Sequence, residues 1–299
     1  MNVSEPILDV RGLTVPLRGQ DGLALEPVNF ELHRGEILSL LGLDTGSQTL
    51  LIDAILGLHR LAEGEVRAFG LPVRDPRALD RIGTVRRRSS FPSGLTVREV
   101  IQLVSAHYQR PAPVDQLLTR FSMTGYESLP TGDLSPEDQR WLAFLLAFSG
   151  DPELILLDHP TVGMDLGWRM QLWDQVQDFV AAGGSALSST HLTQEVEQFA
   201  DRVIVFHRGK IIAEGTPGEI TSNSQMKRVS FRAERVPEHC SNGLHFDRKG
   251  EDWFIDTDDP DRIVGLLQRE GIAWNSLRVD PGDLHSALLH LDSEERREN

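Results

Sequence analysis

The sequence predicts an α/β fold with a mostly parallel sheet covered by helices on both faces, followed by a small α+β domain. One observation is a short apolar strand at residues 36–41, which runs into a glycine-bearing loop and then into a helix at residues 48–58 with apolar side chains at helical spacing. Another is the order strand, helix, strand at residues 153–158, 166–182 and 185–190. This alternation is typical of parallel sheets, because two parallel strands need a long crossover between them.

The remaining elements before residue 221 follow from the same patterns. Residues 137–148 are almost wholly apolar in their later turns, so we expect this helix to be buried. Two short strands separated by Arg208-Gly209 are expected to form a hairpin. Strands are predicted at residues 7–15, 23–32, 202–206 and 210–214, and helices at residues 97–108 and 217–220.

A polar stretch at residues 221–225 is interpreted as a linker between two domains, residues 1–221 and residues 222–299. Beyond it, alternating short strands and helices predict a small α+β domain. Its strands are expected at residues 228–234, 253–257 and 274–279, and its helices at residues 260–270 and 284–291. The charged end of the chain, residues 293–299, is expected to fray.

Composition narrows the class of protein. The longest apolar run, residues 141–148, is far shorter than the roughly 20 residues that cross a bilayer, so no membrane span is expected. Residues 1–9 contain two acids and no basic or long apolar segment, which argues against a signal peptide. A net charge of -15 argues against nucleic acid or an anionic lipid surface as the main partner. The single cysteine, Cys240, cannot form an internal disulfide, so we expect a reducing cytoplasm.

Residues 42–49, Gly-Leu-Asp-Thr-Gly-Ser-Gln-Thr, have the frame of a phosphate-binding loop. Such a loop wraps backbone N–H groups around phosphates, reaches them with a lysine and holds magnesium with a hydroxyl. Gly42 and Thr49 keep the ends of the frame, but Ser47 replaces its second glycine and Gln48 replaces its lysine, and Asp44 adds an acid. The loop therefore predicts weak or absent nucleotide binding, and an ordinary strand-to-helix turn is the alternative interpretation.

Two further segments carry chemistry. The apolar strand that ends in Asp158 is followed directly by His159, and a neutral imidazole can accept a proton near pH 7, so His159 does not by itself exclude catalysis. Residues 135–138, Ser-Pro-Glu-Asp, make a good helix start, with a cap, a proline in the first turn and acids at the positive end. Those acids occupy the place that an anionic phosphate would favour.

In order and spacing, four stretches resemble the motifs of the ATP-binding cassette (ABC) ATPases. They are residues 42–49, 134–139, 154–160 and 189–191, similar to the phosphate loop, the signature loop, the second nucleotide motif and the switch histidine. The resemblance implies a P-loop NTPase-like ABC ATPase domain with a mostly parallel sheet, an antiparallel β subdomain and a helical subdomain. Residues 279–284 resemble the small appended domain of ATPase subunits in ABC-2-type exporters, which implies an accessory role for residues 222–299.

The resemblance also assigns roles to single residues. It implies that His159 replaces the glutamate that activates water, and that His191 is the switch histidine. It implies that Thr49 and Asp158 would hold magnesium. The nucleotide would contact Gly42, Gly46, Ser47, Gln48, Thr49, Ser135 and Asp165. Further departures from the family pattern are Thr45 for a glycine, Arg87 for a glutamine that contacts magnesium, and, in a loose alignment, Leu17 for the aromatic residue that stacks on adenine.

These substitutions lead to the expectation of a degenerate ATP-binding subunit of an ABC transporter complex, with weak or absent binding of ATP and magnesium and little or no hydrolysis. We expect it at the cytoplasmic face of the cell membrane, attached through an integral membrane transporter subunit and working beside a second, catalytically competent ABC ATPase, without nucleic acid. One alternative is a slow but active ATPase with His159 as base, and another is a soluble adaptor that has kept the fold. The basic run of residues 86–88 is interpreted as solvated surface, with docking to the membrane subunit as the second reading.

Overall fold

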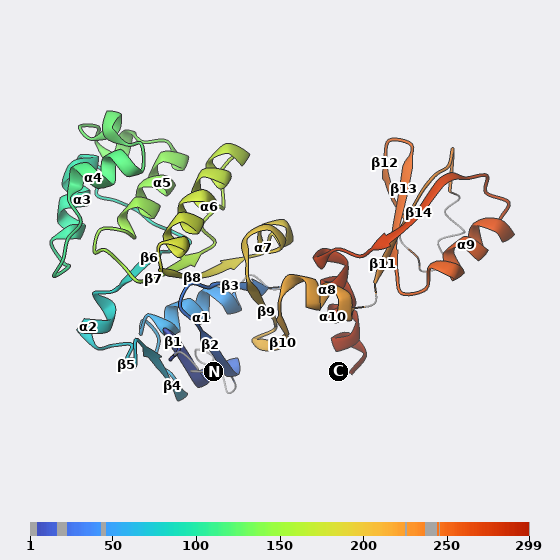
Figure 1. Ribbon diagram of the computed structural model, residues 1–299, viewed down its shortest axis with the longest axis horizontal. Helices are drawn as coiled ribbons and strands as arrows, with labels where there is room; N and C mark the ends of the chain where they lie inside the picture. Colours follow the sequence, from blue (N-terminus) through green and yellow to red (C-terminus); the bar gives the residue numbers. More distant parts are fainter. Residues whose placement is uncertain are drawn as a thin grey trace. The chain divides into compact units, whose positions relative to one another are not determined.

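The computed structural model describes residues 5–16, 23–42, 46–224, 226–236, 244 and 246–298, with side chains as far as residue 291. The chain forms two compact units, Met1–Glu214 and Gly215–Asn299, which are described separately below (Figure 1).

A six-stranded sheet forms the centre of the first unit, with the strand order β10-β9-β3-β8-β7-β6. Strand β3 pairs in parallel with β8 and β9, and β7 pairs in parallel with β6 and β8. Every residue of β7 and β8 is buried, because helices cover both faces of the sheet. Strands β9 and β10 are joined at Arg208 and Gly209, which both have positive φ, as predicted for this turn. The strands are β3 (Ile37–Gly42), β6 (Ile82–Val85), β7 (Leu154–Asp158), β8 (Ser185–Thr190), β9 (Arg202–His207) and β10 (Lys210–Gly215).

A second sheet of the first unit is antiparallel, with the order β2-β1-β4-β5. Its apolar side chains share a core with β3 and with helix α1 (Ser47–Ile55), which follows β3 directly. The strands are β1 (Leu8–Pro16), β2 (Leu23–Leu32), β4 (Glu63–Ala68) and β5 (Leu71–Pro72). The parallel sheet, the antiparallel sheet and the order strand, loop, helix at β3 and α1 confirm the predicted fold class.

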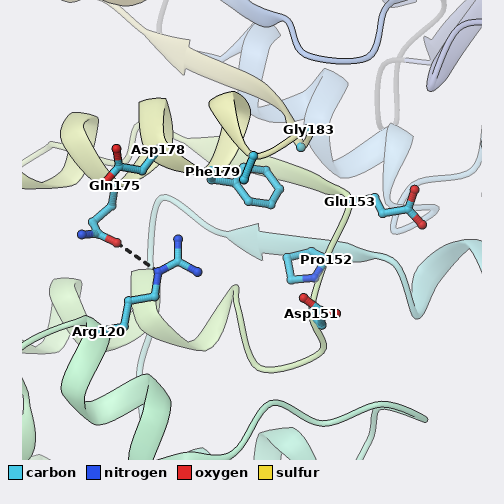
Figure 2. A pocket seen from close by; sticks show the side chains of 10 residues that line it. Arg120, Asp151, Pro152, Glu153, Gln175, Asp178, Phe179 and Gly183 are labelled. Atoms are coloured by element: carbon cyan, nitrogen blue, oxygen red, sulfur yellow. Dashed lines mark hydrogen bonds between the residues drawn. The ribbon is translucent and has the colours of Figure 1, made fainter.

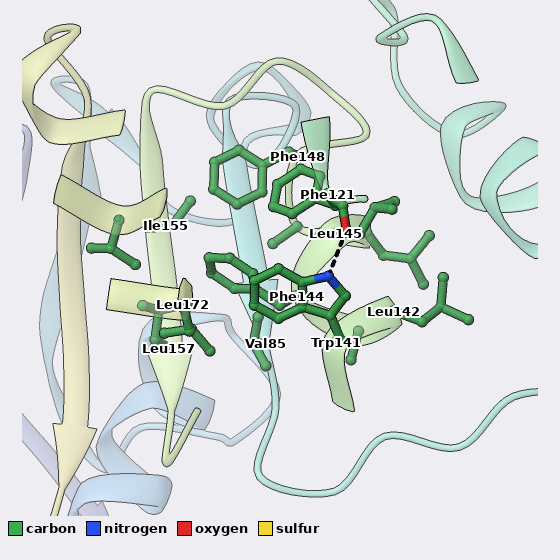
Figure 3. Packing of buried hydrophobic residues seen from close by; sticks show 14 of the residues in the cluster. Val85, Phe121, Trp141, Leu142, Phe144, Leu145, Phe148, Ile155, Leu157 and Leu172 are labelled. Carbon is green, nitrogen blue, oxygen red and sulfur yellow. Dashed lines mark hydrogen bonds between the residues drawn. The ribbon is translucent and has the colours of Figure 1, made fainter. Parts of the chain in front are cut away.

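Helix α5 (Pro136–Leu146) is the centre of the second core of this unit. Its aromatic side chains Trp141 and Phe144 contact Phe121, and the Trp141 indole N–H donates a 2.8 Å hydrogen bond to the Phe121 carbonyl (Figure 3). Val85 at the end of β6 and Leu157 in β7 belong to the same cluster, so α5 packs against the ends of both strands. The other helices of the unit are α2 (Pro76–Leu79), α3 (Val97–Ser105), α4 (Val114–Arg120), α6 (Leu166–Ala181) and α7 (Thr193–Phe199), with 3-10 turns at Thr124–Tyr126 and Thr131–Asp133.

The second unit is an α+β arrangement around an antiparallel sheet with the order β12-β13-β11-β14. Helix α9 packs on β11, and helix α8 packs against helix α10. The elements are α8 (Pro217–Asn223), β11 (Lys227–Arg232), β12 (Asp247–Lys249), β13 (Asp252–Thr257), α9 (Pro260–Arg269), β14 (Asn275–Pro281) and α10 (Leu284–Glu298).

One sequence prediction about this unit is wrong. The expected linker begins inside α8, because Thr216 and Glu219 form a capping box and the hydroxyls of Thr221 and Ser222 donate to carbonyls one turn back. The expected boundary after residue 221 therefore falls within a helix. The end of the chain is helical to Glu298, since its glutamates and arginines are good helix formers, and fraying from residue 293 stays a prediction.

Some predictions fall outside the described residues, namely those on Leu17, Asp44, Thr45, Gln225 and Cys240. Among the described residues, no helix combines the length and the apolar character that crossing a bilayer requires.

Candidate functional site

The end of β3 and the start of α1 place Gln48 at the centre of the candidate site. Its side chain is fully buried, and its amide nitrogen donates a 3.3 Å hydrogen bond to the Thr190 carbonyl at the end of β8. The same amide lies against Gly42, where a methyl group would come within 2.1 Å of the Gln48 nitrogen. The end of β3 is therefore covered by a neutral amide at the position where a phosphate-binding loop carries its lysine.

The Asp158 carboxylate, at the end of β7, accepts hydrogen bonds from three segments: helix α1, strand β8 and the residues after β6. One carboxylate oxygen accepts hydrogen bonds from the hydroxyls of Thr49 (2.9 Å) and Ser189 (2.8 Å). The other accepts from the Arg87 backbone N–H at 3.2 Å. The structure thus brings together the two residues predicted to hold magnesium, Thr49 and Asp158, although protein donors already occupy the carboxylate.

No group of three or more histidine, cysteine or acidic side chains is arranged to hold a metal ion in the described part of the chain. Magnesium is usually held by one or two carboxylates together with substrate phosphates and water. The Thr49 hydroxyl and the Asp158 carboxylate are suitable magnesium ligands. The neutral Gln48 amide, however, supplies no positive charge to hold the phosphates that would complete the magnesium site.

His159 is held in an unusual backbone conformation, with φ of 47°, and its side chain is only 3% exposed. Its backbone N–H donates to the Ser189 hydroxyl at 3.0 Å, and its ring lies 5.5 Å from the ring of His191. Burial lowers the pKa of His159 to about 4, against the opposing effect of Asp158. The imidazole is therefore neutral at pH 7, and its Nε2 atom has no hydrogen-bond partner among the described residues.

Of the other predicted site residues, Ser135 and Asp165 are helix caps. The Ser135 hydroxyl accepts the Asp138 N–H at 3.0 Å and donates to its carboxylate at 2.6 Å, which confirms the interpretation of residues 135–138 as a helix start. The Asp165 carboxylate accepts the Trp168 N–H at 2.9 Å at the start of α6. Gly46 is the cap residue of α1, and Ser47, its first residue, is buried.

Two residues that organise the site received no role from the sequence: Ser189, which lies in the stretch of residues 189–191, and Arg140. The Ser189 hydroxyl connects the Asp158 carboxylate to the His159 backbone. Arg140 is a buried arginine whose guanidinium contacts the segments around residues 86–87 and 158–160. The sequence could have indicated the role of Arg140, because this arginine directly precedes the apolar run at residues 141–148. A charged side chain so close to a buried helix face needs hydrogen-bond acceptors.

The basic run at residues 86–88 is tied to helix α1 through Arg86. The Arg86 guanidinium forms an ion pair with Asp53 at 2.8 Å, while Arg88 is exposed. This pair holds the segment after β6 against helix α1.

A pocket of about 500 Å³ lies near the start of β7, and no predicted site residue lines it (Figure 2). Arg120 and Gln175 face each other across it, joined by a 3.1 Å hydrogen bond. Because Asp158 ends the same strand that residues 151–153 precede, the pocket and the candidate site belong to opposite ends of β7.

The burial of His159 predicts a loss of stability in mild acid. Its folded pKa, about 4, lies below the ordinary value of 6.5, so the unfolded chain takes up the proton first as the pH falls through this window. Between pH 7.5 and pH 4.5 the wild type should lose about 2 kcal/mol more unfolding free energy than His159→Phe. Urea unfolding at both pH values measures this difference, with His107→Gln at an exposed histidine as control; equal losses in wild type and His159→Phe would contradict it.

Comparison with known proteins identifies relatives of this chain. Residues 25–162 match the family model described as ABC transporter. The chain is 29% identical to a Nod factor export ATP-binding protein I from Neorhizobium galegae, over 96% of this chain and 85% of that protein. It is 26% identical to a protein of the same name from Burkholderia lata, over 98% of this chain and 100% of that protein.

Solved structures agree on the fold. An ATP-binding subunit of an ABC transporter superimposes with a TM-score of 0.66 at 24% identity, over 73% of this chain and 92% of that chain. A dimeric ATP-binding cassette in a post-hydrolysis state, bound to ADP and Pi, superimposes with a TM-score of 0.64 at 21% identity, over 70% of this chain and 98% of that chain.

Proposed function

We propose that the chain carries an ABC transporter ATPase domain and that it is a degenerate ATP-binding subunit of an ABC export complex. In this role it supports or regulates the assembly and hydrolyses ATP weakly or not at all. We further propose that the two compact units are the ATPase-like domain and a small accessory domain.

The observation that carries the proposal is the buried amide of Gln48. A lysine at this position supplies a fixed positive charge for the phosphates, and charge-assisted hydrogen bonds are roughly twice as strong as neutral ones. The Gln48 amide supplies no such charge and is instead bonded to Thr190 and packed on Gly42. Weak ATP binding is the consequence we infer for this loop.

The start of α5, in the stretch that resembles the signature loop, also supports weak ATP binding. In the family, the signature loop of one subunit faces the nucleotide bound to its partner, and glycines allow close approach. Here Glu137 and Asp138 lie in the first turn of α5, where the helix dipole would otherwise favour a phosphate. Two acids at this end repel an anionic nucleotide.

The proposed partners follow from these two changes. A homodimer would combine an altered phosphate loop with an altered signature loop in both of its sites. We therefore propose a second, catalytically competent ABC ATPase subunit, together with an integral membrane transporter subunit that holds both at the cytoplasmic face of the membrane. Relatives of this chain bear the name of export ATP-binding proteins, which supports export as the direction.

One observation favours the alternative of a slow ATPase. The neutral His159 ring lies beside His191 with an unpaired Nε2 atom among the described residues, so a proton acceptor is available next to Asp158. Activity of the purified chain separates the two proposals, as the Discussion describes.

Purification of the native complex tests the proposed role. A tagged copy expressed at its natural level, extracted in mild detergent, is expected to bring down a membrane subunit and a second ATPase subunit with an intact lysine and glutamate. Mass spectrometry and subunit stoichiometry measure this composition. A complex with two copies of this chain as its ATPase subunits and ATP-dependent transport would contradict the proposal, and the absence of any membrane protein would favour the soluble adaptor.

A further inference from the structure

Arg140 makes an unusual number of hydrogen bonds for one side chain. It lies near the start of α5 and is only 9% exposed. Its Nε atom donates to the Pro160 carbonyl at 2.8 Å, and one terminal nitrogen donates to the carbonyls of Asp158 (3.1 Å) and His159. Asp158 is the last residue of β7, and the other two acceptors follow it directly.

The other terminal nitrogen of Arg140 reaches a different segment. It donates to the carbonyls of Arg86 (2.7 Å) and Arg87 (2.9 Å), which follow β6. One planar guanidinium therefore satisfies five backbone carbonyls from two loops. Arginine is suited to this task because its five N–H donors have a fixed fork geometry, whereas lysine carries three donors on a single point charge.

The backbone that carries Arg140 is firmly placed. Its neighbour Trp141 and the following residues Leu142, Phe144 and Leu145 are packed in the core with Val85 (Figure 3). Burial lowers the pKa of Arg140, with Asp158 opposing, but an arginine remains charged in proteins. A buried cation of this kind is costly to leave unpaired, so the two loops and the helix are held together.

We propose that Arg140 is a positioning residue that fixes the segments 86–87 and 158–160 to each other and to α5. The left-handed conformation of His159 is then held from two sides, by the Ser189 hydroxyl on its N–H and by Arg140 on its carbonyl. Arg140 therefore links the segment after β6 to the His159 carbonyl, in addition to the hydrogen bond from the Arg87 N–H to the Asp158 carboxylate. The inference goes beyond the proposed function, because it needs no bound nucleotide.

Hydrogen exchange of the full chain, measured by mass spectrometry, tests this role. Arg140→Met and Arg140→Lys should each raise exchange about tenfold in both segments, 86–89 and 158–162, relative to strands β1 and β2. The control Arg169→Met removes a guanidinium that donates to the Met164 carbonyl later in the same connection between β7 and α6, and it should leave both segments unchanged. If Arg140→Met does not fold, Arg140→Lys alone decides.

A double-mutant cycle separates positioning from general stability. Asp53→Asn removes the carboxylate that holds Arg86, so it should loosen residues 86–89 and, through Arg140, residues 158–162 as well. In the Arg140→Lys background, the same Asp53→Asn change should affect residues 158–162 less, and only the hydrogen bond from the Arg87 N–H to Asp158 then joins the two segments directly through a side chain.

Four results would each overturn the proposal. The first two are unchanged exchange in both segments of the Arg140 variants and a uniform rise across the whole chain without excess in the two segments. The third is an equal effect of Asp53→Asn on residues 158–162 in both backgrounds. The fourth is full retention of protection in Arg140→Lys, because the charge alone would then suffice.

Discussion

The purified full chain is expected to release no phosphate from ATP above the rate of a protein-free control. Competent phosphoryl transfer depends on fixed positive charge around the phosphates, and removing one such donor typically costs about 100-fold to 1,000-fold in rate. Gln48 supplies no charge, and the family's activating glutamate is replaced by His159. Because a positioned general base also contributes about 100-fold or more, the two losses together should bring turnover to the background.

A continuous phosphate-release assay with magnesium, at saturating ATP, measures this expectation. The control is Asp158→Asn, which keeps the shape of the side chain next to Thr49 and Ser189 but removes its charge. Magnesium-dependent turnover that disappears in Asp158→Asn would contradict the prediction. If His159→Gln also abolished that turnover, the slow ATPase with His159 as base would replace the degenerate subunit as the better account.

The parts of the fold that could be predicted are those with a strong local pattern. The run from β3 into α1 and the buried strand β7 are apolar segments bounded by clear breaks, so their type and order were evident from residues 36–58 and 153–158. Strand β4, with the sequence Glu-Gly-Glu-Val-Arg-Ala, was missed because four of its six residues are exposed and only pairing with β1 makes it a strand. Tertiary pairing of that kind leaves little trace in hydrophobic periodicity.

In the candidate site, too, some features could be predicted from the sequence and others depend on tertiary packing. The meeting of Thr49 with Asp158 follows from motif order, because the parallel strands of one sheet bring their carboxyl ends to the same edge. The fold-back of Gln48 onto Gly42 and the five carbonyl contacts of Arg140 depend on packing between segments far apart in the sequence. The low pKa of His159 likewise comes from burial, which a residue type and a spacing do not specify.

Restoring the phosphate loop should strengthen ATP binding. The double change Ser47→Gly with Gln48→Lys returns a fixed cation to the loop and removes a buried side chain at the first residue of α1, where backbone N–H groups would face a bound phosphate. Charge-assisted hydrogen bonds contribute about 1.5–3 kcal/mol each, so an affinity gain of roughly 10-fold to 100-fold is expected. Isothermal titration calorimetry of wild type and variant with magnesium and ATP measures the gain.

Gln48→Ala distinguishes missing charge from obstruction as the cause of weak binding. The alanine variant removes the amide that lies on Gly42 and is bonded to Thr190, but it adds no charge. If the missing charge limits affinity, Gln48→Ala should bind ATP as weakly as the wild type, and only the lysine variant should gain. Equal gains in both variants would show that the Gln48 side chain obstructs the loop, and low-micromolar binding by the wild type would contradict the electrostatic argument altogether.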